Sequence, residues 1–215
     1  MISDNINRIK SEIPEQVTLV AVSKYQSLED TQAVLDAGIY DLGESKVQDF
    51  IKKYEVLGDR PRWHFIGHLQ KNKVKYIIGK TFLIHSVDSI ELIDVIERES
   101  KKQGIVTNVL LQLNLAREDS KSGIVIEDLD AVLKVLPRYQ FVKVKGLMAM
   151  GPLIEDNDKI REIFVELKKI YDRIKEESVD DTIQMNYLSM GMTDDYTIAI
   201  EEGSNMIRVG RKIFS

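Results

Sequence analysis

Val17-Thr-Leu-Val-Ala-Val-Ser-Lys24 is an apolar, β-branched segment that ends on a single cation. Valine and threonine favour extended backbone, so residues 17–23 are predicted to form a buried strand with Lys24 at its carboxyl end. A partly desolvated lysine there can act as a neutral amine that attacks an aldehyde or ketone. A lysine that extends into water from a strand end is the more common alternative.

Seven further strand-like segments follow, separated by helical patterns. The predicted strands are 17–23, 39–43, 62–67, 82–87, 108–114, 142–148, 186–189 and 205–209. Residues 158–177 carry apolar side chains at steps of three and four, which is typical of one helical face. Another helix is predicted to start at Asp88, in a capping-box-like sequence, and to run to Lys102.

Glycines and isoleucines set the remaining boundaries. Helices are predicted to stop at Gly38, Gly58, Gly79, Gly104 and Gly203, and an extra amino-terminal helix is predicted from Ile2, Ile6, Ile9 and Ile13, ended by Pro14. Eight alternating strands and helices predict an α/β fold, a single-domain (β/α)8 TIM barrel over residues 1–215. An open doubly wound sheet is the alternative, but it rarely uses eight strands in so short a chain.

Composition excludes several classes of function. The net charge is −5 with both signs interspersed, which argues against nucleic acid as a partner. The chain has no cysteine, so disulfides and thiol catalysis are excluded. Its first residues lack the apolar core of a signal peptide and no apolar run approaches bilayer length, so we expect no membrane association and a cytoplasmic location. His64 and His68 are predicted to face one side of a strand, but no carboxylate-rich pattern accompanies them and no metal site is predicted.

Barrel proteins place their sites at the carboxyl ends of the strands. After the last two predicted strands come Ser189-Met-Gly-Met192, ahead of a helix predicted to begin at Thr193-Asp194, and Gly210. Small residues there allow backbone N–H groups to approach a phosphate, although tight turns alone would also explain the glycines. A phosphate site, Lys24 to hold an aldehyde and Arg208 to face a pyridine nitrogen together suggest pyridoxal 5′-phosphate (PLP) as the ligand. The cation of Arg208 would keep the ring nitrogen unprotonated.

Stretches across nearly the whole chain carry a family resemblance. They are Val20-Ala-Val-Ser-Lys24, Gly43-Glu44, Trp63-His-Phe-Ile-Gly-His-Leu-Gln70, His85-Ser-Val-Asp88, Ser120-Lys-Ser-Gly123, Gly146-Leu-Met-Ala149, Leu188-Ser-Met-Gly-Met192 and Ile207-Arg-Val-Gly210. In these the chain resembles the pyridoxal phosphate homeostasis protein family, single-domain relatives of the alanine racemase barrel.

The resemblance implies roles for particular residues. Lys24 would hold PLP as an aldimine and Arg208 would face the ring nitrogen. The phosphate would be held by Ser189, Gly191, Met192, Gly210 and the backbone of Arg211, and the ring pocket would be lined by Ser86 and Met148. Ser45 stands where the family commonly has asparagine, beside the ring. Arg211 would add charge to the phosphate or point outward, and Lys121 is expected to be solvated, with contact to a phosphorylated ligand as the alternative.

The resemblance further implies a PLP-binding protein that buffers the cofactor or delivers it to PLP-dependent apo-enzymes, with no catalytic turnover. A racemase or decarboxylase acting on amino acids is the alternative enzyme. We also consider an aldolase-like barrel that uses Lys24 on a sugar phosphate. The racemase relatives are dimers with a second β-domain, for which no sequence remains after the last strand, so a monomer without a second acid/base group is expected.

Overall fold

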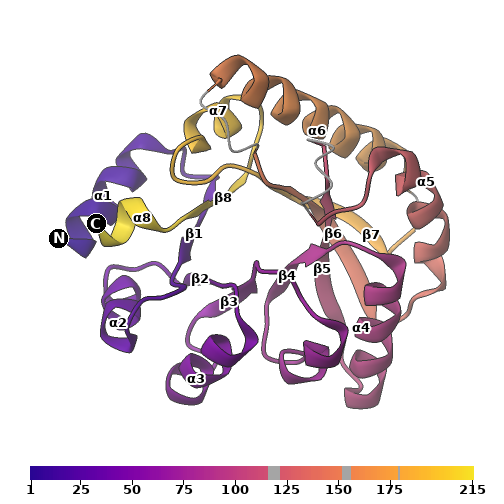
Figure 1. Cartoon of the computed structure of the whole chain (residues 1–215), viewed down its shortest axis with the longest axis horizontal. Coiled ribbons are helices and arrows are strands. Elements are labelled where there is room, and N and C mark those ends of the chain that lie inside the picture. The colour runs from indigo at the N-terminus through magenta and orange to yellow at the C-terminus, as the bar shows by residue number, and fades with distance from the viewer. Residues whose placement is uncertain (116–121, 152–155, 179) are drawn as a thin grey trace.

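The computed structural model describes residues 1–115, 122–151, 156–178 and 180–215, and Lys121 lies outside them. In this part of the chain eight parallel strands close into a barrel in the order of the sequence (Figure 1). The (β/α)8 prediction is therefore confirmed. The strands are β1 Thr18–Val22, β2 Asp41–Glu44, β3 Arg62–Phe65, β4 Leu83–Val87, β5 Thr107–Leu113, β6 Val142–Ala149, β7 Ile183–Ser189 and β8 Met206–Val209.

Helices surround the strands on the outside of the barrel (Figure 1). They are α1 Ile2–Glu12, α2 Leu28–Asp36, α3 Val47–Leu57, α4 Ile90–Gln103, α5 Ile126–Val135, α6 Asn157–Glu177, α7 Tyr196–Glu201 and α8 Arg211–Phe214, with 3-10 turns η1 Lys71–Tyr76 and η2 Leu136–Arg138. The connection from β3 to β4 is thus a 3-10 turn where a regular barrel has an α-helix. None of the helices in the described ranges is long and apolar enough to cross a membrane.

Helix ends follow the sequence signals with two corrections. Ser89, not Asp88, caps α4, because the Ser89 hydroxyl accepts from the backbone of Leu92. Asp195, not Thr193, precedes α7. Gly104 ends α4 in the left-handed conformation at φ +68°, as predicted.

The predicted amino-terminal helix α1 is confirmed and packs against α8, at the other end of the chain (Figure 1). Asn5 Nδ2 donates to the carbonyl oxygens of Ile213 at 3.0 Å and Ser215 at 2.9 Å. These bonds satisfy carbonyls at the end of α8 and just after it, which have no partner within so short a helix. The two ends of the sequence therefore lie side by side.

Apolar side chains form two layers. The larger one lies between the strands and the surrounding helices and includes Phe50, Trp63 and Phe164. The smaller one is a separate cluster contributed by five strands, namely Val20, Leu83, Leu110, Met148 and Met206. Because alternate residues of a barrel strand face inward, this second cluster fills part of the barrel interior.

Gly146 lies at an irregularity of β6. The pairing register shifts on both sides of this residue, between β5 and β6 and between β6 and β7. Its φ is +147°, and a Cβ atom there would lie 1.8 Å from the carbonyl oxygen of Tyr187. A bulge of this kind bends the strand, and only glycine can occupy this position.

Replacing Gly146 by alanine is expected to lower the free energy of unfolding by about 3 kcal/mol, because the new methyl group meets backbone that cannot move aside. Chemical denaturation measures the loss. Gly104→Ala is the matched control, since its φ is also positive but no atom lies within 4 Å of the added Cβ. We expect the control to lose about 1 kcal/mol. Equal losses in the two variants would contradict the steric argument.

Candidate functional site

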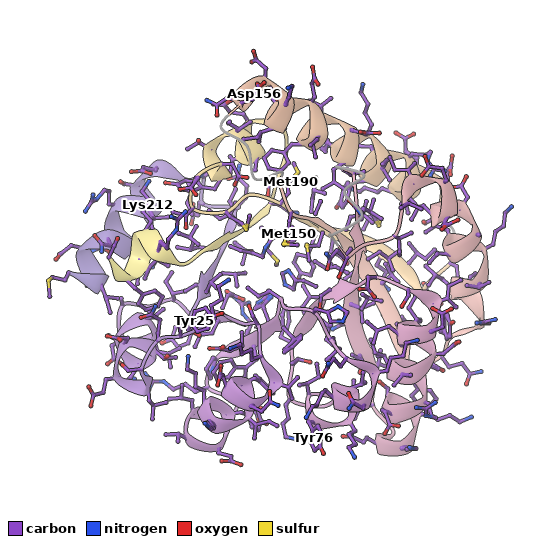
Figure 2. The ribbon with its side chains drawn as sticks, in the orientation of Figure 1. Tyr25, Tyr76, Met150, Asp156, Met190 and Lys212 are labelled. Atoms are coloured by element: carbon purple, nitrogen blue, oxygen red, sulfur yellow. The ribbon has the colours of Figure 1, made fainter. Side chains whose placement is uncertain are left out.

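Most of the predicted site residues lie at or beside the carboxyl ends of the strands. β1 pairs with β8 so that Val20 is opposite Arg208 and Ala21 is opposite Val209. Lys24 and Gly210 therefore follow neighbouring strands at the same end of the barrel. Met148 pairs with Ser189 between β6 and β7. Figure 2 shows Met150 and Met190, each one residue beyond these two strands, near the middle of the barrel in projection.

Lys24 is exposed, as in the alternative of a lysine that extends into water from the strand end. It lies beside Tyr25, whose ring centroid is 6.0 Å from Lys24 Nζ and 5.0 Å from Lys46 Nζ. Tyr25 is itself exposed (labelled in Figure 2) and has a φ of +66°, the one positive value among described residues other than glycine. Such a conformation costs about 1–2 kcal/mol and is concentrated at functional sites. The backbone strain is therefore stored immediately next to Lys24.

A buried charged cluster anchors the residue before Lys24. Lys53 Nζ, from α3, donates to the backbone carbonyl of Ser23 and to Glu44 Oε1, both at 2.6 Å. The Ser23 hydroxyl donates to the same carboxylate oxygen at 2.6 Å. All three residues are buried. The cluster holds the end of β1, and so the origin of the Lys24 side chain, against β2 and α3.

Arg208 is a buried cation, only 4% exposed. Its Nη1 donates to Ser189 Oγ at 2.6 Å and its Nη2 to the carbonyl oxygen of Ala149 at 3.0 Å. Burial lowers the pKa of Arg208 to about 10, and the nearby charge of Asp195 opposes that change only in part. A buried charge held by neutral acceptors destabilises a fold, so its presence at a strand end is typical of a ligand site.

The loop after β7 is shaped by its packing and hydrogen bonding against α7. Gly191 has a φ of +93°, and a Cβ there would lie 2.6 Å from the Cβ of Ala199, so close packing against α7 requires glycine. The backbone N–H of Met192 donates to the buried carboxylate of Asp195. Burial raises the pKa of Asp195, although this hydrogen bond and Arg208 oppose the rise. The turn alternative therefore explains Gly191 without a phosphate.

Gly210 and Arg211 follow β8. A Cβ at Gly210 would approach the carbonyl oxygen of Val22 to 3.3 Å, so residue 210 lies against the end of β1. The side chain of Arg211 is exposed and pairs with Asp194, which is also exposed. Of the two orientations considered for Arg211, the structure shows the outward one.

The three side chains expected around the cofactor ring lie at the ends of alternate strands, β2, β4 and β6. Ser86 is buried, and its hydroxyl has no hydrogen-bond partner among the described residues. Ser86 lies where the pairing register between β4 and β5 shifts. Such an irregularity changes the direction of the side chains beside it. Met148 belongs to the apolar cluster inside the barrel. Ser45 is half-buried, and its backbone packs on Gly67, where a Cβ would lie 2.1 Å from the Ser45 carbonyl oxygen.

The sequence interpretation did not predict that two buried histidines, His64 and His85, contact each other. His64 and His68 were predicted to face one side of a strand, but β3 ends at Phe65 and His68 is exposed, whereas His64 is fully buried. His64 Nδ1 lies 2.8 Å from His85 Nε2, and His85 Nδ1 lies 3.0 Å from Ser189 Oγ. The buried strand positions of both histidines were the only available signal.

Comparison with known proteins identifies the family. The model of the alanine racemase N-terminal domain matches residues 1–215. The chain is 39% identical to the pyridoxal phosphate homeostasis protein of Aquifex aeolicus, over 91% of this chain and 85% of the relative, and 40% identical to that of Helicobacter pylori, over 92% and 87%. The structure of PipY from Synechococcus elongatus with PLP bound superposes with a TM-score of 0.92 at 30% identity and covers 100% of both chains. The chain therefore belongs to the pyridoxal phosphate homeostasis protein family, within the alanine racemase N-terminal domain fold.

Proposed function

We propose that this chain binds PLP at the carboxyl end of the barrel, covalently through Lys24, and serves intracellular PLP homeostasis by buffering or delivering the cofactor without turnover of its own. The PLP-bound structure of PipY and the names of the curated relatives support this proposal. The family-model match over residues 1–215 supports a single PLP-binding domain.

Arg208 is the observation that carries the proposal. The guanidinium is buried, donates to neutral acceptors, and lies on the strand that pairs with β1, which leads to Lys24. A guanidinium has only N–H donors, so it suits the lone pair of an unprotonated pyridine nitrogen. Bound PLP supplies an aldehyde for condensation with an amine and a ring that withdraws electrons. A neighbouring cation keeps the ring nitrogen unprotonated, so the ring withdraws electrons less strongly.

Each remaining residue has a role in binding. The amine of Lys24 would hold PLP at its aldehyde carbon. The free hydroxyl of Ser86 is available to the polar edge of the ring, and Met148 supplies an apolar surface beneath it. For the phosphate we propose Ser189, Gly191, Met192, Gly210 and the backbone of Arg211, with Ser45 on the other side of the ring. The outward side chain of Arg211 leaves its backbone N–H for the phosphate.

Borohydride reduction of the purified protein after incubation with PLP is expected to fix a pyridoxyl group on Lys24, detected by peptide mapping. The protein should absorb visible light before reduction. Lys24→Ala should lose the label, whereas Lys46→Ala should keep it, since Lys46 is an exposed lysine next to the same Tyr25 ring. A label elsewhere, with Lys24 unmodified, overturns the assignment.

Turnover, location and partners require separate tests. The PLP-loaded protein is incubated with a panel of amino acids. We expect no racemisation or decarboxylation above the level that Lys24→Ala shows. We further propose a cytoplasmic monomer, checked by fractionation and by sedimentation. Delivery to PLP-dependent apo-enzymes is tested by whether the loaded protein activates such an apo-enzyme faster than the same concentration of free PLP.

A further inference from the structure

A line of buried polar side chains crosses the barrel from Arg208 on β8 to Asp41 at the start of β2. Arg208 Nη1 is 2.6 Å from Ser189 Oγ, and Ser189 Oγ is 3.0 Å from His85 Nδ1. His85 Nε2 is 2.8 Å from His64 Nδ1, and His64 Nε2 is 2.9 Å from Asp41 Oδ1. Four hydrogen bonds therefore join five side chains from five different strands.

The chemistry of the two end groups fixes the direction of every bond between them. Burial disfavours the Asp41 carboxylate, but hydrogen bonds from His64 and Arg62 outweigh burial and lower its pKa, so it accepts only. His64 must then donate from Nε2 and, being neutral, accept at Nδ1. Arg208 at the other end can only donate. His85 must therefore donate from Nε2 and accept the Ser189 proton at Nδ1.

Burial keeps both histidines neutral. Each is fully buried. Desolvation lowers the pKa of His64, even though Asp41 favours its charged form. Desolvation lowers the pKa of His85 well below its ordinary value, and His64 and Arg208 add to the effect. With neutral rings, each ring nitrogen of the line has one partner of the right kind, and Ser189 Oγ has both a donor and an acceptor.

The far end of the line reaches the opposite face of the barrel. Asp41 also accepts from Arg62, whose side chain is more than half exposed. Both residues line a cavity of about 450 Å³, together with Lys10, Glu15 and Tyr40. Because β2 starts at Asp41 and its carboxyl end faces Lys24, solvent reaches this carboxylate from the side away from the proposed cofactor site.

We propose that Asp41, His64, His85 and Ser189 form a one-directional hydrogen-bond relay that positions the charged guanidinium of Arg208 against the ring nitrogen of PLP. His64 and His85 are positioning residues in this relay, each held as the tautomer with its proton on Nε2. The proposal rests on the proposed function for its ligand. It assigns the Ser189 hydroxyl to Arg208 and His85, in place of the phosphate contact proposed for that residue above. Its consequence is that a charge at one face of the barrel sets how the cofactor is held at the other.

Nitrogen-15 NMR of histidine-labelled protein without PLP tests the relay independently of the cofactor. The chain has three histidines, so the spectrum is simple to assign with His68→Gln. We expect two rings in the neutral Nε2–H form whose shifts do not change between pH 6 and 8. Exposed His68 supplies the reference for a ring in contact with water. An Nδ1–H tautomer or a charged ring at His64 or His85 overturns the proposed direction.

Asp41→Asn tests the link to the cofactor, because it keeps the shape of the side chain and removes a charge remote from Lys24. We expect PLP to bind about threefold more weakly or worse, with a shifted pH profile of the bound-cofactor absorption. Asp36→Asn is the matched control and should change neither, since Asp36 also pairs with an arginine, Arg60, but on the surface.

Failure of this proposal differs from failure of the proposed function. If the unmodified protein takes up PLP on Lys24 and Asp41→Asn matches it in affinity and pH profile, the relay is wrong and the function stands. If the unmodified protein takes up no PLP, the proposed function is wrong and the NMR tautomers still decide whether the relay exists. His85→Gln interrupts the relay at a second point. We expect it to weaken PLP binding more than His68→Gln does.

Discussion

Replacing Lys53 by methionine is expected to lower the free energy of unfolding by about 4 kcal/mol. The ammonium is buried and donates to the Ser23 carbonyl and to Glu44 Oε1. Glu44 is fully buried, and its second oxygen, Oε2, has no hydrogen-bond partner among the described side chains and backbone. Methionine fills a similar volume but leaves the carboxylate without its counter-charge, which is the costly way to break a buried ion pair.

Urea denaturation measures this loss, with Lys52→Met as the matched control for Lys53→Met. Lys52 is the preceding residue of α3 and is exposed, so its replacement should change stability by less than about 0.5 kcal/mol. The double variant Glu44→Gln with Lys53→Met should recover part of the loss, because no unpaired charge then remains. A loss below about 1 kcal/mol for Lys53→Met would show that water or another cation compensates Glu44.

The same cluster shows why the barrel could be predicted and its interior could not. Strand and helix periodicity are local, so the eight strands were placed within three residues of their observed ends. Lys53 has the sequence context of a surface lysine on an amphipathic helix. Its burial depends on Glu44 and Ser23, which are brought together only when β1 and β2 pair. Pairing of this kind is absent from any single segment.

The candidate site was predicted unevenly for the same reason. Arg208 was identified because a barrel presents its strand ends at one face, whereas the role of Ser86 was implied by the family resemblance. The line through His64 and His85 joins β2, β3, β4, β7 and β8 across the interior, so no spacing in the sequence reports it. For Lys24 the sequence left two alternatives, a partly desolvated amine and a side chain that extends into water, and the structure shows the lysine exposed beside Tyr25.

Acidification from pH 7 to pH 5 is expected to lower the free energy of unfolding by up to about 2 kcal/mol for each histidine that stays neutral in the fold. His64 and His85 both have pKa values lowered below the ordinary 6.5, chiefly by burial. The unfolded chain therefore binds protons that the folded chain excludes. Stability is fully present above pH 6.5 and falls as the pH drops below it.

The charges around the two rings decide whether this fall is complete. Asp41 favours a charged His64, whereas Arg62 and Arg208 disfavour charge on His64 and His85 respectively. Denaturation of His85→Gln at several pH values should give a shallower dependence than the unmodified protein, and His68→Gln is the control that removes an exposed histidine. If His85→Gln and the unmodified protein lose stability in parallel between pH 7 and pH 5, then His85 is not held neutral, and the hydrogen-bond direction derived for the barrel interior fails with it.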